Sequence, residues 1–232
     1  KEHYPDAHVV IYEKGTKLLS KVKVSGGGRC NVTNNEPSIA VFSKAYPRGS
    51  KLLKKLFSKF NSKHTIEWFK KRRVELVVEP DGRMFPSSNS SSTIIDCFLK
   101  ECEKLKIDIV LKKGITGISS TLNKKLNVLF HDHSTLAFDY VIIASGGYPK
   151  KASYDWLKND VTQIDTPIPS LFTFNMPTES IKDLMGVVAP KAIASVLGSK
   201  LRSEGPLLIT HWGMSGPAIL KLSAFGAELL HE

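Results

Sequence analysis

Three consecutive glycines followed by an arginine and a cysteine form the most chemically suggestive stretch of the sequence, SGGGRC at Ser25–Cys30. Because glycines have no side chains, they let backbone N–H groups approach a planar or anionic ligand closely. Arg29 adds a positive charge that can meet a phosphate. The alternative is a tight turn that carries a surface arginine. In either case the run is too glycine-rich for a regular helix or strand, and we expect a loop held close to another group.

A single acidic residue follows the apolar run Ala7–Tyr12 (AHVVIY), which is typical of a buried parallel strand that ends in a turn. A dinucleotide-binding βαβ unit needs a glycine turn, a helix N-terminus facing the pyrophosphate, and an acid at the end of its second strand. Glu13 stands where that acid belongs, although strands also end at solvent-facing charges. The glycine turn lies roughly 20 residues upstream of the acid in such units, and only twelve residues precede Glu13. The numbered chain is therefore expected to begin inside the first helix.

Three further side chains have reactive or charged groups in suitable contexts. Cys30 can act as a redox thiol, because the adjacent Arg29 favours a thiolate, or it can be inert packing. Arg83 lies in GRMFPSS and can orient an anionic substrate or a nicotinamide cofactor, whereas the neighbouring Phe85 can simply anchor the loop. His211 in THWGMSGP is the best-placed acid or base, since a histidine pKa of about 6.5 permits proton exchange near neutrality. A structural histidine is the alternative.

Composition narrows the class of protein. The chain has 232 residues, of which 41% are hydrophobic and 24% are charged, as in ordinary soluble globular proteins. It has no run of about 18 apolar residues and no charged-then-apolar layout at its start, so neither a membrane partner nor secretion is expected and the cytoplasm is the expected location. Its three cysteines form no CxxC pair, which argues against a disulfide framework and against a structural metal site.

The formal net charge of +11 is concentrated in one segment. Between Lys44 and Arg73 there are eleven Lys or Arg residues and one acid, Glu67, so that this segment alone contributes +10. Such runs are usually solvated helix faces, and this is our default interpretation. The alternative is a nucleic-acid-binding module, in which lysines neutralise phosphates and Trp68 or Phe69 stacks on bases.

Apolar periodicity predicts several helices that position these groups. Helical spacing is found over residues 50–60 and again from Ile66 onward. A further helix is expected over Thr93–Lys106, with Ser92 as its N-cap. A last helix is expected from Gly216 to Leu230, because Pro217 suits the first helical position and Ser215 suits the N-cap. Within the third helix, Cys97 and Cys102 are expected to be packing residues.

The remaining pattern predicts strands and two domains. Three β-rich pieces, Ile115–Ser119, Leu126–Phe130 and Leu136–Phe138, predict an antiparallel meander. The apolar run Tyr140–Ala144 predicts a second central parallel strand, whose glycine-rich end is a place that ligands favour. Beyond about Tyr154 the chain is richer in proline, so we place a domain change near residue 166, with one domain over residues 1–165 and the start of another over residues 166–232.

Six motifs occur in an order that makes a resemblance specific, namely VVIYEKG, SGGGRCNVTN, GRMFPSS, YVIIASGG, PSLFTF and THWGMSGPAIL. In these motifs the chain resembles the NAD(P)/FAD-dependent oxidoreductase family of bacterial flavoproteins, the aminoacetone oxidase-like or HI0933-like group. The similarity spans nearly the whole chain, and the ten-residue motif SGGGRCNVTN carries most of its weight. The resemblance implies an α/β, Rossmann-like FAD-binding domain that lacks its first strand and its C-terminal flavin-covering segment. The meander and part of an inserted second domain complete the implied fold.

The resemblance also implies roles for particular residues. Glu13 would bind the adenosine ribose, Ile115 would meet adenine through its backbone, and Arg83 would lie on the substrate side. Cys30 and His211 are the candidate catalytic residues. The full set of implied cofactor contacts is Glu13, Lys14, Ser25, Gly26, Gly27, Gly28, Arg29, Cys30, Asn31, Thr33, Ile115, Ala144, Ser145, Gly146 and Gly147.

The implied reaction is transfer of a hydride or electrons through bound FAD, with NAD(P)H as the donor and a small molecule as the acceptor. Two alternatives stay open at this point. One is the nucleic-acid-binding module built on Lys44–Arg73, and the other is a truncated flavoprotein that keeps the core of the fold without cofactor or activity.

Overall fold

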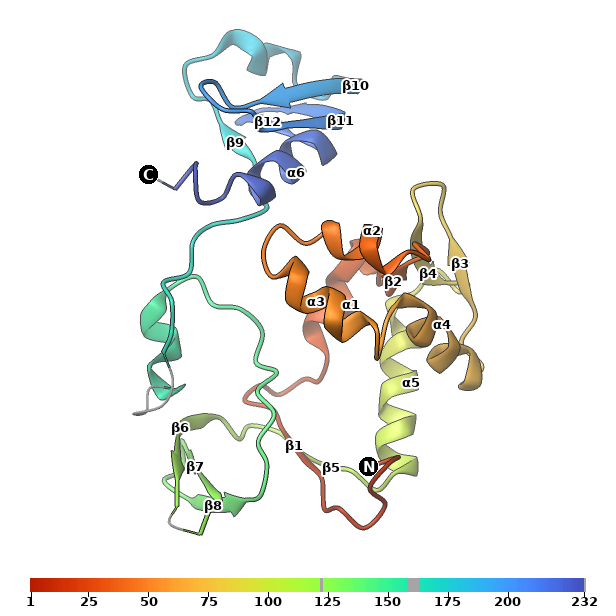
Figure 1. The fold of residues 1–232 in the computed structure, drawn as a ribbon, viewed down its shortest axis with the longest axis vertical. Coiled ribbons are helices and arrows are strands. Elements are labelled where there is room, and N and C mark those ends of the chain that lie inside the picture. The colour runs from red at the N-terminus through yellow and green to blue at the C-terminus, as the bar shows by residue number, and fades with distance from the viewer. Residues whose placement is uncertain (122, 158–162, 232) are drawn as a thin grey trace. The chain divides into compact units, whose positions relative to one another are not determined.

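The computed structural model describes residues 1–121, 123–157 and 163–231. Contacts between residues divide the chain into two compact units, Lys1–Val141 and Ile142–Glu232, whose elements are labelled in Figure 1. Within the described ranges, every helix is too short or too polar to cross a lipid bilayer.

The first unit contains a parallel pair of strands. β1 (Val10–Tyr12) pairs with β5 (Asp108–Val110), with Val10 opposite Asp108 and Tyr12 opposite Val110. This pairing confirms the parallel α/β character predicted from AHVVIY, since a parallel pair requires a crossover connection. The expectation of a fully buried strand is wrong, because β1 has one partner strand among the described residues and Ile11 is 40% exposed. β5 was not predicted, since three residues directly after a helix give too short a pattern to detect.

Five α-helices lie between β1 and β5 in the described sequence. The bounds are α1 (Ser20–Val24), α2 (Ile39–Lys44), α3 (Ser50–Phe57), α4 (Ser62–Lys71) and α5 (Ser91–Lys104). The helices predicted over residues 50–60 and from Ile66 onward are confirmed as α3 and α4, although α4 begins four residues before Ile66. The third predicted helix is confirmed as α5, but its N-cap is Ser90, whose hydroxyl accepts from the Ser92 N–H at 3.3 Å, and not Ser92.

Two small antiparallel sheets complete the first unit. One has the order β2 (Thr33–Asn34), β4 (Arg83–Pro86), β3 (Leu76–Val78), so β4 is central. The other is β6 (Ile115–Ser120), β7 (Leu126–Phe130) and β8 (Thr135–Phe138), which confirms the predicted meander. Tyr12 joins the meander to β1, since its ring centroid lies 4.8 Å from that of Phe130.

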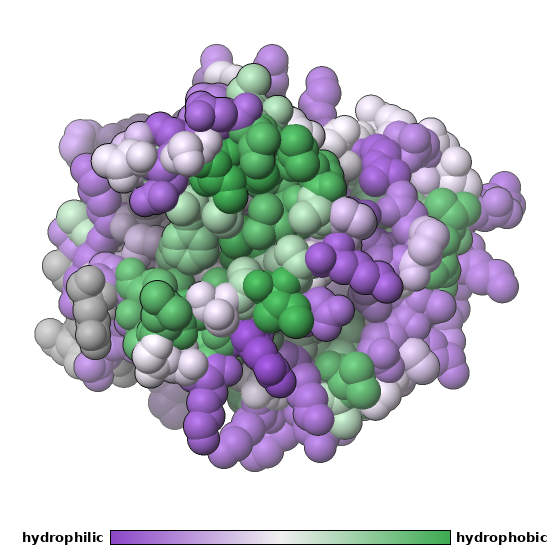
Figure 2. Space-filling model, turned by 90° about the horizontal axis from the view of Figure 1, so that it is seen from above, coloured by the Kyte–Doolittle hydropathy of each residue, from purple (hydrophilic) through white to green (hydrophobic). Residues whose placement is uncertain are grey.

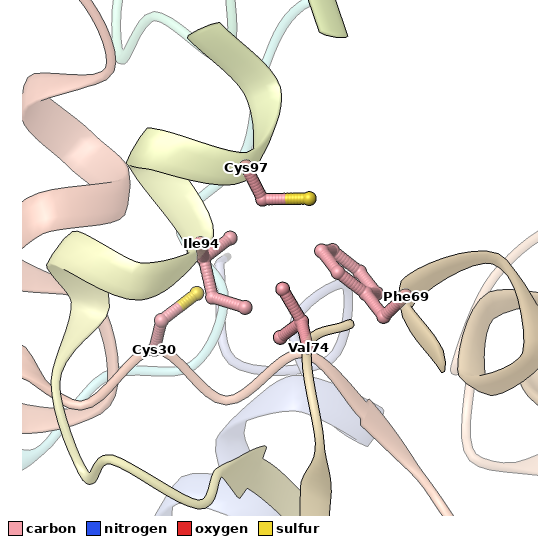
Figure 3. Close-up of a cluster of buried hydrophobic side chains, with 5 residues drawn as sticks. All are labelled: Cys30, Phe69, Val74, Ile94 and Cys97. Atoms are coloured by element: carbon pink, nitrogen blue, oxygen red, sulfur yellow. The ribbon is translucent and has the colours of Figure 1, made fainter. Parts of the chain in front are cut away.

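A buried apolar cluster lies beside α5 (Figure 3). It comprises Cys30, Phe69, Val74, Ile94 and Cys97, contributed by α4, α5 and the segments next to β2 and β3. The predicted packing role of Cys97 is confirmed, because its side chain is in this cluster and is 6% exposed. Cys102, five residues further along α5, is only partly buried.

The second unit is a four-stranded antiparallel sheet with one helix against it. Its strands are β9 (Phe174–Asn175), β10 (Val188–Ser195), β11 (Arg202–Thr210) and β12 (Gly213–Ser215), in the order β10-β11-β12-β9, and 3₁₀ turns occur at η2 (Lys151–Leu157) and η3 (Ser180–Leu184). The helix α6 (Pro217–Phe225) buries Ala218, Ile219 and Leu222. It begins with Pro217 as predicted, but it ends five residues earlier than expected, and its N-cap is Gly216 and not Ser215.

The N-cap of α6 has a steric reason to be glycine. Gly216 has φ 96°, and a Cβ there would lie 2.8 Å from the Pro206 carbonyl oxygen and 2.9 Å from the Leu208 nitrogen. A residue with a side chain therefore cannot occupy this corner without moving β11. Ser215, by contrast, is the last residue of β12 and is paired with Leu208.

The predicted central strand over Tyr140–Ala144 is not formed. No strand is assigned there within the described residues, and Tyr140 and Ile142 are 89% and 91% exposed. Large apolar residues are exposed elsewhere too, and Figure 2 shows hydrophobic residues at the surface in green. An apolar run of this kind becomes a parallel strand only when neighbouring strands supply its backbone hydrogen bonds, and the described residues supply none for it.

Candidate functional site around the glycine turn

The structure brings two of the sequence motifs onto neighbouring strands. β2 lies in SGGGRCNVTN and β4 in GRMFPSS, and they pair antiparallel, with Thr33 opposite Met84. Just before β2, the Val32 N–H donates to the Met84 carbonyl at 2.8 Å. Val32–Asn34, at the end of the first motif, are therefore held against β4 by backbone hydrogen bonds across about fifty positions of sequence.

The three glycines form a left-handed turn that follows α1. Ser25–Gly28 is a 3₁₀ turn (η1), in which Gly26, Gly27 and Gly28 have φ of 55°, 68° and 84°. The Cys30 N–H closes the turn by donating to the Ser25 carbonyl at 3.0 Å. The expected loop is thus an ordered turn, and its positive φ angles explain the glycines, since other L-residues rarely adopt them.

Each glycine meets a different environment. A Cβ at Gly26 would lie 2.8 Å from the Asn31 nitrogen and 3.0 Å from the Phe85 ring, so this glycine is required by packing. A Cβ at Gly27 would meet nothing within 4 Å, and one at Gly28 only the Lys23 carbonyl at 3.9 Å. The backbone at positions 27 and 28 therefore faces open space, as a ligand-binding turn must.

Arg29 and Arg83 share one carboxylate. Nη1 of Arg29 donates to Oε1 of Glu79 at 2.6 Å, and Nη2 of Arg83 donates to Oε2 of the same residue at 3.0 Å. Both guanidinium groups also approach the Phe85 ring, with Cζ at 4.0 Å from its centroid for Arg29 and at 5.5 Å for Arg83. Arg29 therefore lies beside the turn with its charge paired to Glu79 and stacked on an aromatic face.

A second acid completes this cluster. Asp81 accepts from the Arg83 backbone N–H at 3.1 Å and from Nε at 2.7 Å. The hydrogen bond from the Arg83 N–H, together with its guanidinium, holds the pKa of Asp81 below its usual value. Arg29, at the end of the glycine turn, and Arg83 are thus neutralised by two carboxylates of the hairpin between β3 and β4.

Glu79 was missed by the sequence reasoning, although a signal for it exists. The run EPDGR has proline, aspartate and glycine in the order typical of a turn. Such a turn predicts a hairpin in which Glu79 and Arg83 face each other, and here the Glu79 N–H donates to the Arg83 carbonyl at 2.8 Å.

Cys30 lies at the end of the glycine turn but inside the protein. Its side chain is 7% exposed and packs in the apolar cluster of Figure 3, with φ 63° at its own backbone. Burial raises the pKa of Cys97, its neighbour in that cluster. These surroundings fit the packing interpretation of Cys30 better than the redox interpretation, because a reactive thiol is normally partly exposed and near positive charge.

Backbone hydrogen bonds bring Glu13 close to the start of the meander. The Glu13 N–H donates to the Val110 carbonyl at 2.9 Å, and the Lys113 N–H donates to the Glu13 carbonyl at 3.0 Å, two residues before Ile115. The side chain turns back on the chain, since Oε1 accepts from the Gly15 N–H at 2.6 Å. Lys14 is exposed beside it.

The remaining predicted residues belong to the second unit. Ala144–Gly147 lie in an exposed irregular segment, where Gly146 has φ 78°. His211 is exposed in the two-residue turn between β11 and β12, and its ring lies edge-on to Trp212 with centroids 4.4 Å apart. Within the described ranges, no group of three or more His, Cys, Asp or Glu side chains is arranged to hold a metal ion.

The first unit is a Rossmann-like α/β domain. Three of its features agree with this class: the parallel β1–β5 pair, the acid after β1 and the left-handed glycine turn. Comparison with family models agrees: the HI0933-like protein Rossmann domain matches residues 2–168, and the HI0933-like protein barrel and H2TH domain matches residues 168–232. The chain belongs to the HI0933-like family. The domain boundary near residue 166 and the individual site residues stay predictions.

Curated relatives cover the same stretch. The chain is 27% identical over 233 residues to the ribosomal RNA dihydrouridine synthase of Escherichia coli (strain K12), with 94% of this chain and 54% of that protein covered. It is 23% identical to the 3-dehydro-bile acid delta(4,6)-reductase of Clostridium scindens, with 98% and 56% covered. It is 24% identical to the ribosomal RNA dihydrouridine synthase of Haemophilus influenzae, with 94% and 55% covered. The chain therefore spans about half the length of these relatives.

Proposed function

We propose that the chain is part of a flavin-dependent oxidoreductase that binds FAD and receives electrons from NAD(P)H. The observation that carries this proposal is the open glycine turn: at Gly27 and Gly28 the backbone is left-handed and unobstructed, within a Rossmann-like domain. Turns of this kind present backbone N–H groups to the phosphates or the ring of a dinucleotide.

The first unit has residues suited to the adenosine part of FAD and others suited to its pyrophosphate and flavin. Glu13 ends β1 with a carboxylate that keeps acceptor capacity beyond its bond to the Gly15 N–H, as ribose hydroxyls require. Ser25–Thr33 would lie along the pyrophosphate and flavin, and Ile115 near the adenine. Lys14 would lie beside the ribose, and cofactor binding by Ala144–Gly147 stays a prediction.

When bound, the flavin supplies the chemistry, taking a hydride from NAD(P)H and passing it to an acceptor. The names of the relatives suggest the acceptor's class. Dihydrouridine is uridine with two hydrogens added across the double bond of its base, and a delta(4,6)-reductase also adds hydrogen to double bonds. We propose that the acceptor here is an electron-poor carbon–carbon double bond, with a uridine of RNA as the first candidate.

Such a reduction adds a proton as well as a hydride, so it needs an acid. Of the two candidates, His211 has an exposed imidazole that substrate can reach, whereas Cys30 is buried. His211→Gln is expected to lower the rate of substrate reduction and leave flavin content unchanged. An equal rate would remove His211 from the reaction.

The test of the cofactor is the visible spectrum of the purified chain before and after addition of FAD. Bands of oxidised flavin that persist through gel filtration would support the proposal, and their anaerobic bleaching by NADH or NADPH would identify the donor. A colourless protein that does not retain added FAD would overturn it, and would favour a chain with the fold but without the cofactor.

A further inference from the structure

The cationic segment identified in the sequence forms an exposed surface on three helices. Of its eleven Lys and Arg side chains, only Arg72 is partly buried, where it pairs with Glu2 and Glu101 and stacks 3.6 Å from the Trp68 ring. The others are exposed. We call the surface formed by Lys51, Lys55, Lys59, Phe60 and Lys63 the lysine face.

Three lysines of this face repeat every fourth residue. Lys51 and Lys55 lie on α3, and Lys59 continues the same spacing directly after it. Like charges at this spacing repel and destabilise a helix. Among the described residues, no carboxylate comes within ion-pair distance of these three ammonium groups. The repulsion is thus uncompensated within the described chain, which distinguishes this face from a surface laced with salt bridges.

The opposite side of α3 is fixed by aromatic packing. The Phe57 ring lies 4.8 Å from that of Phe42 and 5.6 Å from that of Tyr46, centroid to centroid, so α3 is held against α2. The lysines are therefore presented on an anchored helix, in a set spacing along one side.

An exposed aromatic side chain, Phe60, directly follows Lys59 in the sequence. Phe60 is 55% exposed, and its ring is stacked on His64 with centroids 5.8 Å apart and an interplanar angle of 27°. Exposed aromatic rings next to cations are the usual platform for the bases of single-stranded or looped RNA, while lysines contact the phosphates.

We propose that the lysine face is a docking surface for RNA, which it binds through the phosphate backbone and one base stacked on Phe60. The inference rests on the proposed function in taking an RNA uridine as the substrate. It assigns the binding of the substrate's backbone to residues outside the cofactor turn. Leu52 and Leu56, 63% and 53% exposed beside the lysines, make an anionic membrane the competing occupant.

The test uses the 232-residue chain, a fluorescein-labelled RNA stem-loop and titrations at several salt concentrations. The variant carries Lys51→Glu, Lys55→Glu and Lys59→Glu, and a second version carries Gln at the same positions to limit any effect on α3. The control carries Lys191→Glu, Lys200→Glu and Lys221→Glu, an equal change of charge at exposed lysines of the second unit. Circular dichroism checks that all three fold.

We expect RNA binding to weaken roughly 10-fold or more in both lysine-face variants, with the salt dependence reduced by about one phosphate contact per lysine. The control should bind RNA almost as the unaltered chain does, and Phe60→Ala should weaken binding without changing the salt dependence. Equal losses in the variant and the control would overturn the proposal, as would binding to phosphatidylglycerol vesicles without binding to RNA.

The flavin spectrum of the same preparations separates this inference from the proposed function. If the chain retains flavin but does not bind RNA, the docking surface is contradicted and the proposed function is not. If the chain binds RNA through the lysine face but retains no flavin, the oxidoreductase proposal is contradicted and the docking surface is supported.

Discussion

Arg29 donates from Nη1 to Oε1 of Glu79 at 2.6 Å, which ties the end of the glycine turn to the hairpin that carries the second motif. Because Glu79 also binds Arg83, its removal leaves two arginines without their common partner. The pair is partly exposed, so the cost is screened by solvent. We predict that Glu79→Gln lowers the free energy of unfolding by about 1 kcal/mol, measured by urea denaturation. Glu75→Gln, on an exposed side chain nearby, should change it by less than about 0.5 kcal/mol, and an equal effect of both would contradict the shared-carboxylate role.

Adjacent glycines of the turn should respond differently to substitution. Alanine at either position adopts a left-handed conformation at a cost of about 1–2 kcal/mol. Gly26→Ala should cost more, because its Cβ would press on the Asn31 nitrogen and the Phe85 ring, whereas Gly27→Ala meets open space. We predict that Gly26→Ala is the less stable variant in thermal unfolding, and that Gly27→Ala retains less FAD than its stability alone would explain. Normal FAD retention by Gly27→Ala would remove that position from the cofactor site.

Glu13 should matter for the cofactor and little for the fold. Loss of hydrogen bonds to a charged group typically costs about 1.5–3 kcal/mol, so Glu13→Ala should raise the dissociation constant for FAD about 10- to 100-fold. Titration followed by flavin fluorescence measures this. Glu103→Ala, at an exposed position of α5, serves as the control. Unchanged affinity in Glu13→Ala would exclude Glu13 from ribose binding.

Cys30 offers a choice between packing and redox chemistry. Because its side chain is buried among apolar groups, Cys30→Ser places a hydroxyl there and should destabilise the chain by about 1–3 kcal/mol. Cys102→Ser, at a partly exposed position, should cost less. In stopped-flow assays we expect the rate of flavin reoxidation to be the same in Cys30→Ser as in the unaltered chain. A slower rate at equal flavin content would establish the thiol as a redox group.

The meander contains a pH-sensitive ion pair. The hydrogen bond from Lys113 lowers the pKa of Asp132 well below its usual value of 3.8. A carboxyl whose pKa is lower in the folded chain stabilises the fold above its unfolded pKa, and this contribution is lost as the pH falls through the folded value. The unaltered chain should therefore lose more thermal stability between neutral and strongly acidic pH than Asp132→Asn does. Asp96→Asn, at an exposed aspartate, should behave as the unaltered chain; identical pH profiles for all three would refute the effect.

Local patterns predicted the elements whose signal lies within one stretch of sequence. α3, α4 and α5 have apolar residues at helical spacing, and the strands of the meander are separated by polar turns. The β2–β4 pairing could not be predicted in this way, because it joins Thr33 to Met84 and no local pattern reports which strands meet. Tyr140–Ala144 is the opposite case. Its apolar composition predicted a central strand, but composition does not show whether neighbouring strands are present to pair with it.

The site was predictable where a residue's chemistry is visible in its own motif. The glycines at positions 26–28 predicted a loop, which is an ordered turn in the structure, and the position of Glu13 predicted the end of β1. The pairing of Arg29 with Glu79 was not visible, since it depends on a hairpin fifty residues away. Burial of Cys30 likewise depends on α4 and α5 closing over it.

The contact between Gly26 and the Phe85 ring has a consequence for how the chain can vary. A Cβ at position 26 would lie only 3.0 Å from the Phe85 ring, so a larger residue at 26 would collide with that ring. A smaller residue at 85 would relieve only one of two close contacts, because the Asn31 nitrogen lies 2.8 Å from the same place. If both codons are randomised together and folded clones are selected, glycine should therefore persist at 26 whatever residue is found at 85. The first motif would then keep this glycine even where the second motif has changed.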